Sequence, residues 1–126
     1  MKIKIEAKKG IASKFPISDG IISDNFVFTS GQIYMKDGQL LEGTIEEQTH
    51  QVMSNLKTIL EAADVGFDEV VKTTIYITDM SLYGRINDVY RTYFSDPFPA
   101  RETVCVKELP AGAKLEISVI ATRNKN

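Results

Sequence analysis

The chain has 126 residues, 43% of them hydrophobic and 25% charged, which is typical of one globular domain that folds without disulfides. Its net charge of −2 argues against a nucleic-acid partner, because no basic surface is available for a polyanion. No run approaches the roughly 20 apolar residues of a membrane span, and the N-terminus lacks a signal-peptide pattern. We expect a single cytoplasmic domain over residues 1–126 that does not bind membranes.

The first forty residues predict short β-strands joined by turns. Residues 2–6 alternate basic and apolar side chains with a period of two, which is typical of a strand at a sheet edge. Residues 20–22 and 26–30 are two β-rich runs separated by the turn-forming residues 23–25, so they predict a hairpin. The sequence Lys36-Asp37-Gly38 predicts another turn before the first helix.

The segment Thr44-Ile45-Glu46-Glu47 has the form of a capping box, with Thr44 as the N-cap and Glu47 reaching back. A helical stripe with spacings of three and four follows it and predicts a helix that packs on a sheet. The stripe consists of Ile45, Gln48, Val52, Leu56, Ile59, Leu60 and Ala63.

The remaining elements alternate strand and helix. Residues 70–77 are rich in β-branched side chains and predict a strand whose apolar positions are Val71, Ile75 and Ile77. Asp79 or Ser81 is expected to cap a second helix, and the prolines at 97 and 99 end it. Two alternating strands, 101–106 and 114–122, complete an α+β fold in which two helices cover one face of a mixed sheet.

The last two strands assign side chains to the two faces of that sheet. Val104 and Val106 share one parity and are expected to meet the helices, so the other parity faces away: Arg101, Thr103 and Cys105. Glu116 is expected on the same far face, where Phe26, Phe28 and Tyr76 also lie in one register. A face that mixes aromatic and charged side chains is typical of an interface and predicts self-association.

Arg101 and Glu116 have two interpretations. In the simpler one they form an ion pair between neighbouring strands. In the other they form a site, because a guanidinium matches a carboxylate with two parallel hydrogen bonds and suits a small organic acid. Glu116 would then orient or deprotonate a water molecule beside that acid.

The single histidine and the single cysteine are not predicted to be reactive. His50 lies on the polar face of the first helix and is expected to be solvated. Cys105 has no imidazole partner to stabilise a thiolate and is expected to pack. One thiol and one imidazole cannot build a zinc cluster, so no metal is expected.

Several separated motifs occur in a familiar order: Thr29-Ser30-Gly31-Gln32-Ile33, Gln48, Asn55-Leu56, Lys72-Thr73-Thr74, Asn87 with Tyr90 and Phe94, Pro99-Ala100-Arg101, Leu109-Pro110 and Leu115-Glu116-Ile117. From about residue 16 to 123 the chain resembles the RidA/YjgF family of reactive-intermediate deaminases. The resemblance implies a chorismate-mutase-like fold and a homotrimer with clefts between subunits. It also implies cofactor-free hydrolysis of enamines and imines (2-aminoacrylate, 2-iminopropanoate, 2-iminobutanoate) to 2-keto acids and ammonia.

The same resemblance assigns roles to individual residues. Arg101 matches the arginine that holds the substrate carboxylate, and Glu116 matches the acidic residue associated with the attacking water. Ser30 and Gly31 match the cleft wall. The resemblance further matches Asn87 to a residue of the neighbouring helix and Thr103 to a position where some members have cysteine.

One segment departs from the family pattern. Where the family often reads Pro-Tyr-Ser-Gln-Ala, with the tyrosine hydroxyl in the cleft, this chain reads Pro16-Ile17-Ser18-Asp19-Gly20. Deamination then proceeds without that hydroxyl, or Ser18 or Tyr34 supplies the contact, or the chain binds a different ligand. The alternative to the deaminase is therefore a non-catalytic trimer that binds a 2-keto acid or related metabolite in a regulatory role. Ribonuclease or translation-inhibitor activity, described for some members, ranks third because of the net charge.

Overall fold

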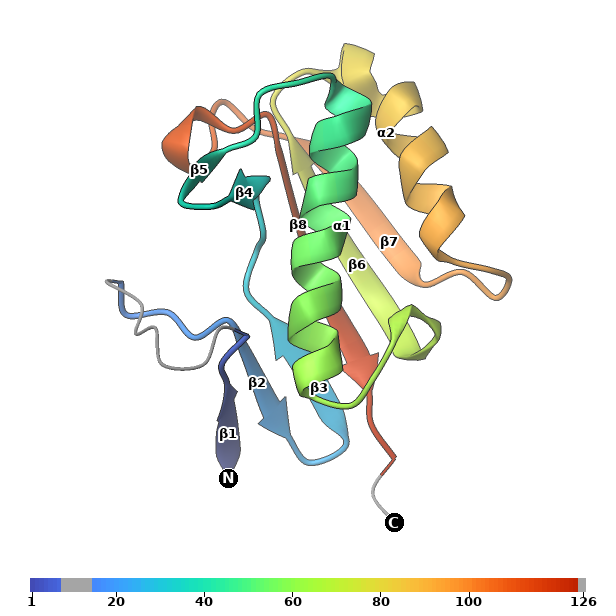
Figure 1. Ribbon diagram of the computed structural model, residues 1–126. Helices are drawn as coiled ribbons and strands as arrows, with labels where there is room; N and C mark the ends of the chain where they lie inside the picture. Colours follow the sequence, from blue (N-terminus) through green and yellow to red (C-terminus); the bar gives the residue numbers. More distant parts are fainter. Residues whose placement is uncertain (8–14, 125–126) are drawn as a thin grey trace.

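The computed structural model describes residues 1–7 and 15–124, and its centre is one six-stranded sheet in the order β1-β2-β3-β8-β6-β7 (Figure 1). All neighbouring strands are antiparallel except β6 and β7, so the sheet is mixed as predicted. The strands are β1 (Lys2–Ile5), β2 (Gly20–Ser23), β3 (Phe26–Thr29), β6 (Val70–Ile77), β7 (Ala100–Cys105) and β8 (Leu115–Thr122).

Two helices, α1 (Ile45–Ala62) and α2 (Tyr83–Tyr90), lie on the same face of this sheet, which confirms the predicted α+β architecture (Figure 1). The small hairpin of β4 (Met35–Lys36) and β5 (Gln39–Leu40) forms a separate two-stranded sheet. Its turn residues Asp37 and Gly38 both have positive φ, as a two-residue hairpin turn requires. Neither helix of the described chain has the length and apolar content needed to cross a bilayer.

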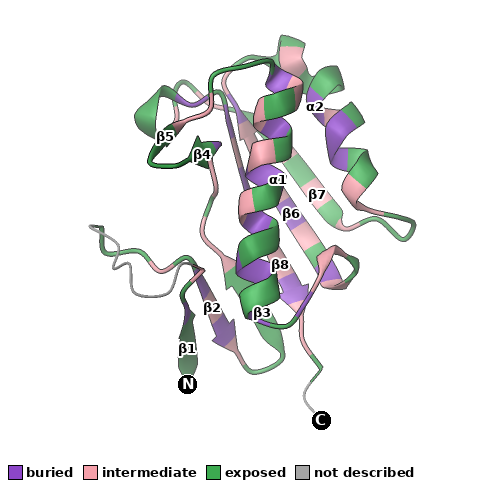
Figure 2. Cartoon of the chain, in the orientation of Figure 1, coloured by how far each residue is buried: buried purple, intermediate pink, exposed green. Residues whose placement is uncertain are grey.

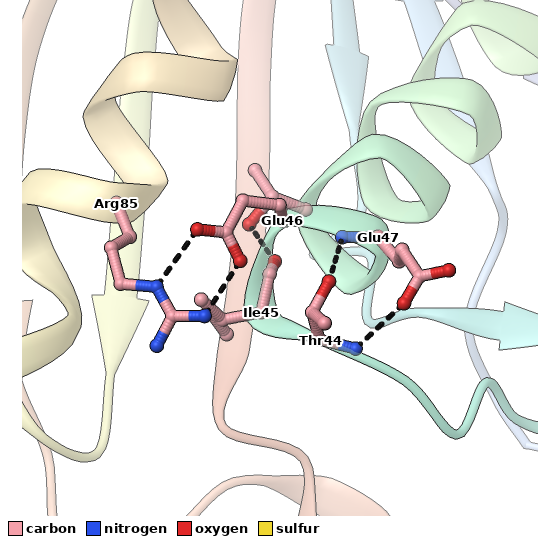
Figure 3. A network of polar contacts seen from close by, with 6 residues as sticks. Thr44, Ile45, Glu46, Glu47 and Arg85 are labelled. Carbon is pink, nitrogen blue, oxygen red and sulfur yellow. Dashed lines mark hydrogen bonds and ion pairs between the residues drawn. The ribbon is translucent and has the colours of Figure 1, made fainter.

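The predicted capping box starts α1. The Glu47 amide donates to Thr44 Oγ1 at 3.1 Å, and the Thr44 amide donates to Glu47 Oε1 at 2.9 Å (Figure 3). The buried stripe differs slightly from the prediction, because Thr49 and Met53 are buried while Gln48 is only half-buried. Thr49 is tolerated there because its hydroxyl donates to the Ile45 carbonyl at 2.7 Å.

An ion pair joins the first turn of α1 to α2. Arg85 of α2 donates to both carboxylate oxygens of Glu46, with Nε and Nη2 at 2.8 and 2.7 Å (Figure 3). This pairing, together with a backbone hydrogen bond at the helix start, lowers the pKa of Glu46 from 4.5 to about 2, with the Arg85 hydrogen bond as the larger cause. Asp79 caps the short turn Met80–Leu82 rather than α2 itself, which begins at Tyr83. The ion pair therefore fixes α2 relative to the start of α1.

Two expectations about side-chain direction are wrong. A register shift in β6 between Val70 and Lys72 buries Val70 and leaves Val71 43% exposed. In β7, Arg101 pairs with the fully buried Thr73, so its parity is the helix-covered one, whereas Val104 is 44% exposed on the open face. The strand lies at the sheet edge, where its position beside β6, not its valines, sets its parity.

The sheet face away from the helices is partly apolar, as predicted. Phe26 and Phe28 are 44% and 40% exposed and their ring centroids lie 6.2 Å apart. Figure 2 shows β7 alternating between exposed and intermediate residues, whereas β8 alternates between buried and intermediate ones. The register with β6 and β8 adds Tyr76, Val104 and Ile120 to the open face, next to the Lys72–Glu102 ion pair at 3.1 Å.

Candidate functional site

Arg101 projects from β7 toward α2, where aromatic side chains hold its guanidinium. The guanidinium carbon lies 4.9 Å from the ring centroid of Tyr90 and 5.6 Å from that of Tyr83. Its Nη2 also donates to the Tyr83 hydroxyl at 2.9 Å. Within the described residues no carboxylate forms an ion pair with Arg101. Rings attract a cation without neutralising it, so the charge stays available for an anion.

The residues around Arg101 are themselves fixed in place. Tyr90 is buried, and its hydroxyl donates to Thr73 Oγ1 at 3.0 Å, a contact that ties α2 to the central strand β6. Burial raises the pKa of Tyr90. Asn87 and the positive charge of Arg101 lower the pKa of Tyr83, with the Asn87 hydrogen bond as the larger cause. The guanidinium therefore has a defined orientation before any ligand binds.

A cavity of about 240 Å³ opens beside this guanidinium. It contains the predicted site residue Asn87, which lies four residues after Tyr83 on the same side of α2. Its lining combines cations, an amide and apolar surfaces: Asn87, Tyr90, Arg91, Phe98, Pro99 and Arg101. This is the composition of a site for a small organic anion.

Glu116 lies in β8 with its side chain on the open face, opposite Tyr76 of β6. Partial burial raises the pKa of its carboxyl group above the ordinary value of 4.5. Within the described part of the chain, no hydrogen-bond donor or cation pairs with this carboxylate. A carboxylate with a raised pKa and no partner suits a proton acceptor.

Gly31 packs directly against Glu116. A Cβ atom at position 31 would lie 2.5 Å from Glu116 Oε2 and 2.6 Å from its Cδ, so only glycine leaves this carboxylate where it is. The neighbouring Gln32 forms a bridge with Ile117, with its amide donating at 2.8 Å and its carbonyl accepting at 3.0 Å. This bridge holds Gly31 against β8.

Ser30 and Ile17 lie on the segment before this contact. The Ser30 hydroxyl donates to the Ser18 carbonyl at 2.6 Å, and the Ser30 amide donates to the Asp19 carbonyl at 2.9 Å. Ile17 is 57% exposed and lines a separate cavity of about 300 Å³, next to Asn55 and Gln32. Gly31 and its neighbour Ser30 therefore lie beside Glu116, whereas the cavity that Ile17 lines includes neither Arg101 nor Glu116 among its lining residues.

Arg101 and Glu116 leave the sheet on opposite faces. Arg101 is paired with Thr73 and Glu116 with Tyr76, and positions three apart in one strand point to opposite sides. Moreover, β7 and β8 are separated by β6. The predicted ion pair between neighbouring strands is therefore wrong. The chain carries two separate clusters, which we name the candidate half-sites: the Arg101 half-site with Tyr83, Asn87 and Tyr90, and the Glu116 half-site with Ser30 and Gly31.

The remaining candidates have mixed outcomes. Thr103 lies on the Arg101 side of β7, and its hydroxyl is buried without a hydrogen-bond partner among the described residues. Tyr34 is buried with its hydroxyl accepting from the Lys114 amide at 2.9 Å, so it does not replace the family tyrosine. Cys105 is exposed rather than packed. His50 is exposed as expected, and its Nδ1 lies 2.7 Å from the Tyr93 hydroxyl.

Sequence reasoning gave no site role to Tyr83 or to Tyr90, both of which contact the Arg101 guanidinium. It also overlooked Arg91 and Phe98, which line the cavity. The signal for two of these was present, because Tyr83 and Arg91 lie four residues before and four residues after the predicted Asn87, on one side of α2 and its end.

Comparisons with known proteins identify the family of the chain. A family model described as endoribonuclease L-PSP matches residues 8–123. The chain is 43% identical over 108 residues to a RutC family protein of Pyrococcus horikoshii, covering 84% of this chain and 86% of that protein. It is 38% identical over 121 residues to a Mus musculus protein named 2-iminobutanoate/2-iminopropanoate deaminase, covering 94% and 90%.

Solved structures of other proteins also match the chain in fold and sequence. The Rid family protein YyfA of Yersinia pestis matches with a TM-score of 0.91 and 42% identity over 97% of this chain and 99% of that chain. TdcF of E. coli, solved with bound serine, matches with a TM-score of 0.88 and 33% identity over 97% and 99%. By sequence, motif order and fold, the chain belongs to the RidA/YjgF family.

Proposed function

We propose that this chain hydrolyses the enamine and imine intermediates 2-aminoacrylate, 2-iminopropanoate and 2-iminobutanoate to 2-keto acids and ammonia. The observation that carries the proposal is the Arg101 guanidinium, which Tyr83 and Tyr90 orient and no described carboxylate neutralises. Such a group binds the carboxylate that all three substrates share. No cofactor takes part in the proposed reaction.

The proposed hydrolysis requires only that the protein position the substrate and supply one proton acceptor. An enamine first takes a proton at its terminal carbon, loses one from its nitrogen and becomes the imine. Water then adds its oxygen to the imine carbon and gives a proton to Glu116, whose raised pKa suits it to accept one. The nitrogen takes up two protons, one returned by Glu116 and one from the added hydroxyl group, and leaves as ammonia while the carbonyl of the 2-keto acid forms. Arg101 holds the substrate carboxylate throughout.

A complete site requires two copies of the chain, because Arg101 and Glu116 lie on opposite faces of one sheet. We therefore place the substrate between subunits, with Arg101 from one copy and Glu116, Ser30 and Gly31 from another. The exposed aromatic residues of the open face, Phe26 and Phe28, support self-association, and a homotrimer is the assembly proposed.

The names of relatives support the same substrate class. The Mus musculus relative is named a deaminase of 2-iminobutanoate and 2-iminopropanoate, and TdcF was solved with serine, which carries the carboxylate that Arg101 would bind. Ile17 marks the main difference from the family pattern, and the proposed reaction proceeds without the tyrosine hydroxyl. The competing proposal is a trimer that only binds 2-keto acids.

The experiment that separates the two generates 2-aminoacrylate from serine with a dehydratase and follows its disappearance. We expect the wild-type protein to accelerate the loss, and Arg101→Ala to abolish that acceleration, because losing a charge-assisted carboxylate pair costs about 2–4 kcal/mol. Circular dichroism of Arg101→Ala is expected to match the wild type. No acceleration by the wild type, together with binding of 2-oxobutanoate, would favour the binding protein instead.

A further inference from the structure

The cavity beside Arg101 contains a second cation that the proposed reaction does not use. Arg91 begins the turn Arg91–Tyr93 directly after α2 and is a lining residue of the same cavity of about 240 Å³. The substrates proposed above carry one carboxylate, which Arg101 already holds. These substrates therefore do not explain the presence of a second arginine at this cavity.

Neither guanidinium is neutralised within the chain. In the described residues, no Asp or Glu lines this cavity, and no carboxylate forms an ion pair with Arg91 or Arg101. Two like charges at one cavity repel each other unless an anion lies between them, and that repulsion disfavours an empty site relative to one filled by a dianion. The charge pattern thus selects ligands by their number of negative charges.

The surface around the two cations fits a short carbon chain. Phe98, which is 51% exposed, and Pro99 line the cavity together with the ring of Tyr90. Asn87 adds an amide that can donate to an oxygen or accept from an imine N–H. Apolar walls and two cationic residues, Arg91 and Arg101, match a molecule with a carboxylate at each end and methylene groups between the two carboxylates.

We propose that this site prefers dicarboxylic substrates, the imines of acidic amino acids, with Arg101 holding the carboxylate next to the imine carbon and Arg91 holding the distal one. This inference rests on the proposed deaminase function for its catalytic part. The reaction is the same: water supplies the carbonyl oxygen, the C–N bond breaks, and a 2-oxo dicarboxylic acid and ammonia form. Arg91 is a specificity residue and takes no part in the bond changes.

Binding tests the preference without depending on catalysis. The matched probes are 2-oxoglutarate and 2-oxopentanoate, which share a five-carbon chain and differ only in the distal carboxylate. By titration calorimetry we expect the wild type to bind 2-oxoglutarate at least tenfold more tightly. Arg91→Gln should weaken 2-oxoglutarate binding roughly tenfold and change 2-oxopentanoate binding less than twofold. Lys57→Gln removes the same charge from the exposed face of α1 and should change neither.

Turnover of the imines made from glutamate and norvaline provides the catalytic arm, and kcat/KM should show the same preference and the same loss in Arg91→Gln. Equal wild-type affinity for both oxo acids, or an equal loss for both in Arg91→Gln, would overturn the dicarboxylate preference. If neither imine is hydrolysed but 2-oxoglutarate binds preferentially through Arg91, the catalytic part of this inference fails and the dicarboxylate site stands; the deaminase proposal itself is decided by the 2-aminoacrylate assay above.

Discussion

The Arg101 guanidinium has no counter-ion beside it, because the groups that orient it are aromatic rather than acidic. A carboxylate in the place of Tyr83 or Tyr90 would hold the guanidinium as firmly but would also neutralise it, and a substrate would then have to displace a built-in anion. The two rings and one hydroxyl instead restrict its rotamers without placing an anion beside the guanidinium. Preorganisation of this kind lowers the entropy lost when a carboxylate binds.

Gly31→Ala tests whether the position of the Glu116 carboxylate matters. The added methyl group would lie 2.5 Å from Oε2, so the carboxylate must move, while the backbone at this position needs no unusual φ. Because the displaced atoms end a flexible side chain, we expect folding to be kept and kcat for imine hydrolysis to fall by about tenfold or more. Unchanged kcat in a folded variant would show that Glu116 does not need its observed position.

Glu116→Gln tests the proton acceptor and has a pH signature. The pKa of Glu116 is raised, so the base form and the activity should be lost as pH falls through a value above 4.5. We expect Glu116→Gln to lower kcat strongly and to remove this acidic limb, with little change in 2-oxobutanoate binding. A raised carboxyl pKa also means that the charged form costs stability, so the variant should be the more stable protein at pH 7, and this difference should disappear below pH 4.5. If the pH–activity profile of Glu116→Gln still falls on the acidic side as in the wild type, the titrating group is not Glu116.

The contact between α1 and α2 determines where Tyr83, Asn87 and Tyr90 meet Arg101. Arg85→Ala removes the pairing with Glu46, and we expect a lower melting temperature at pH 7 and a raised KM for imines. Since the folded pKa of Glu46 is about 2 against an ordinary 4.5, this stabilisation is present above pH 4.5 and lost as pH falls to about 2. The melting difference should therefore shrink over that interval. A difference that is constant from pH 7 to 2 would mean that the pair contributes through packing alone.

Local sequence signals predicted α1, the β2–β3 hairpin and the faces of β8 because each is decided by nearby residues. The capping box at Thr44 and the alternation from Leu115 to Ala121 are both satisfied within one element. The parity of β7 was mispredicted because an edge strand with valines on one side and Arg101 on the other has no such internal signal. Its register with Thr73 comes from a parallel neighbour far away in the sequence, and the buried Thr73 and Tyr90 provide the polar and aromatic surroundings that Arg101 needs.

The candidate site was predictable in its residues but not in its arrangement. Family motifs pointed to Arg101 and Glu116, yet only the register shows that one sheet separates them. Tyr83 was missed because helical spacing alone makes an aromatic residue look like core, and only its exposure of 37% and its hydrogen bond to Arg101 show otherwise.

In the proposed arrangement, the separation of the two half-sites makes hydrolysis depend on assembly of the chain. If each site joins Arg101 of one copy to Glu116 of another, a monomer should be inactive. Light scattering at micromolar concentration is expected to give three times the 14.1 kDa mass of one chain, and dilution that yields monomers should abolish activity. A fully active species of 14.1 kDa would place the whole reaction within one chain.

Complementation between two inactive variants tests the shared site most directly. Arg101→Ala keeps a normal Glu116 half-site, and Glu116→Gln keeps a normal Arg101 half-site, so a mixed assembly contains some sites with both wild-type groups. Random mixing of equal amounts gives each site a one-in-four chance of this pairing, so co-expression should restore about a quarter of the wild-type rate of 2-aminoacrylate hydrolysis. Arg101→Ala mixed with the double variant should stay inactive. Activity of the mixed assembly no higher than that of the separate variants would contradict a site built from two copies.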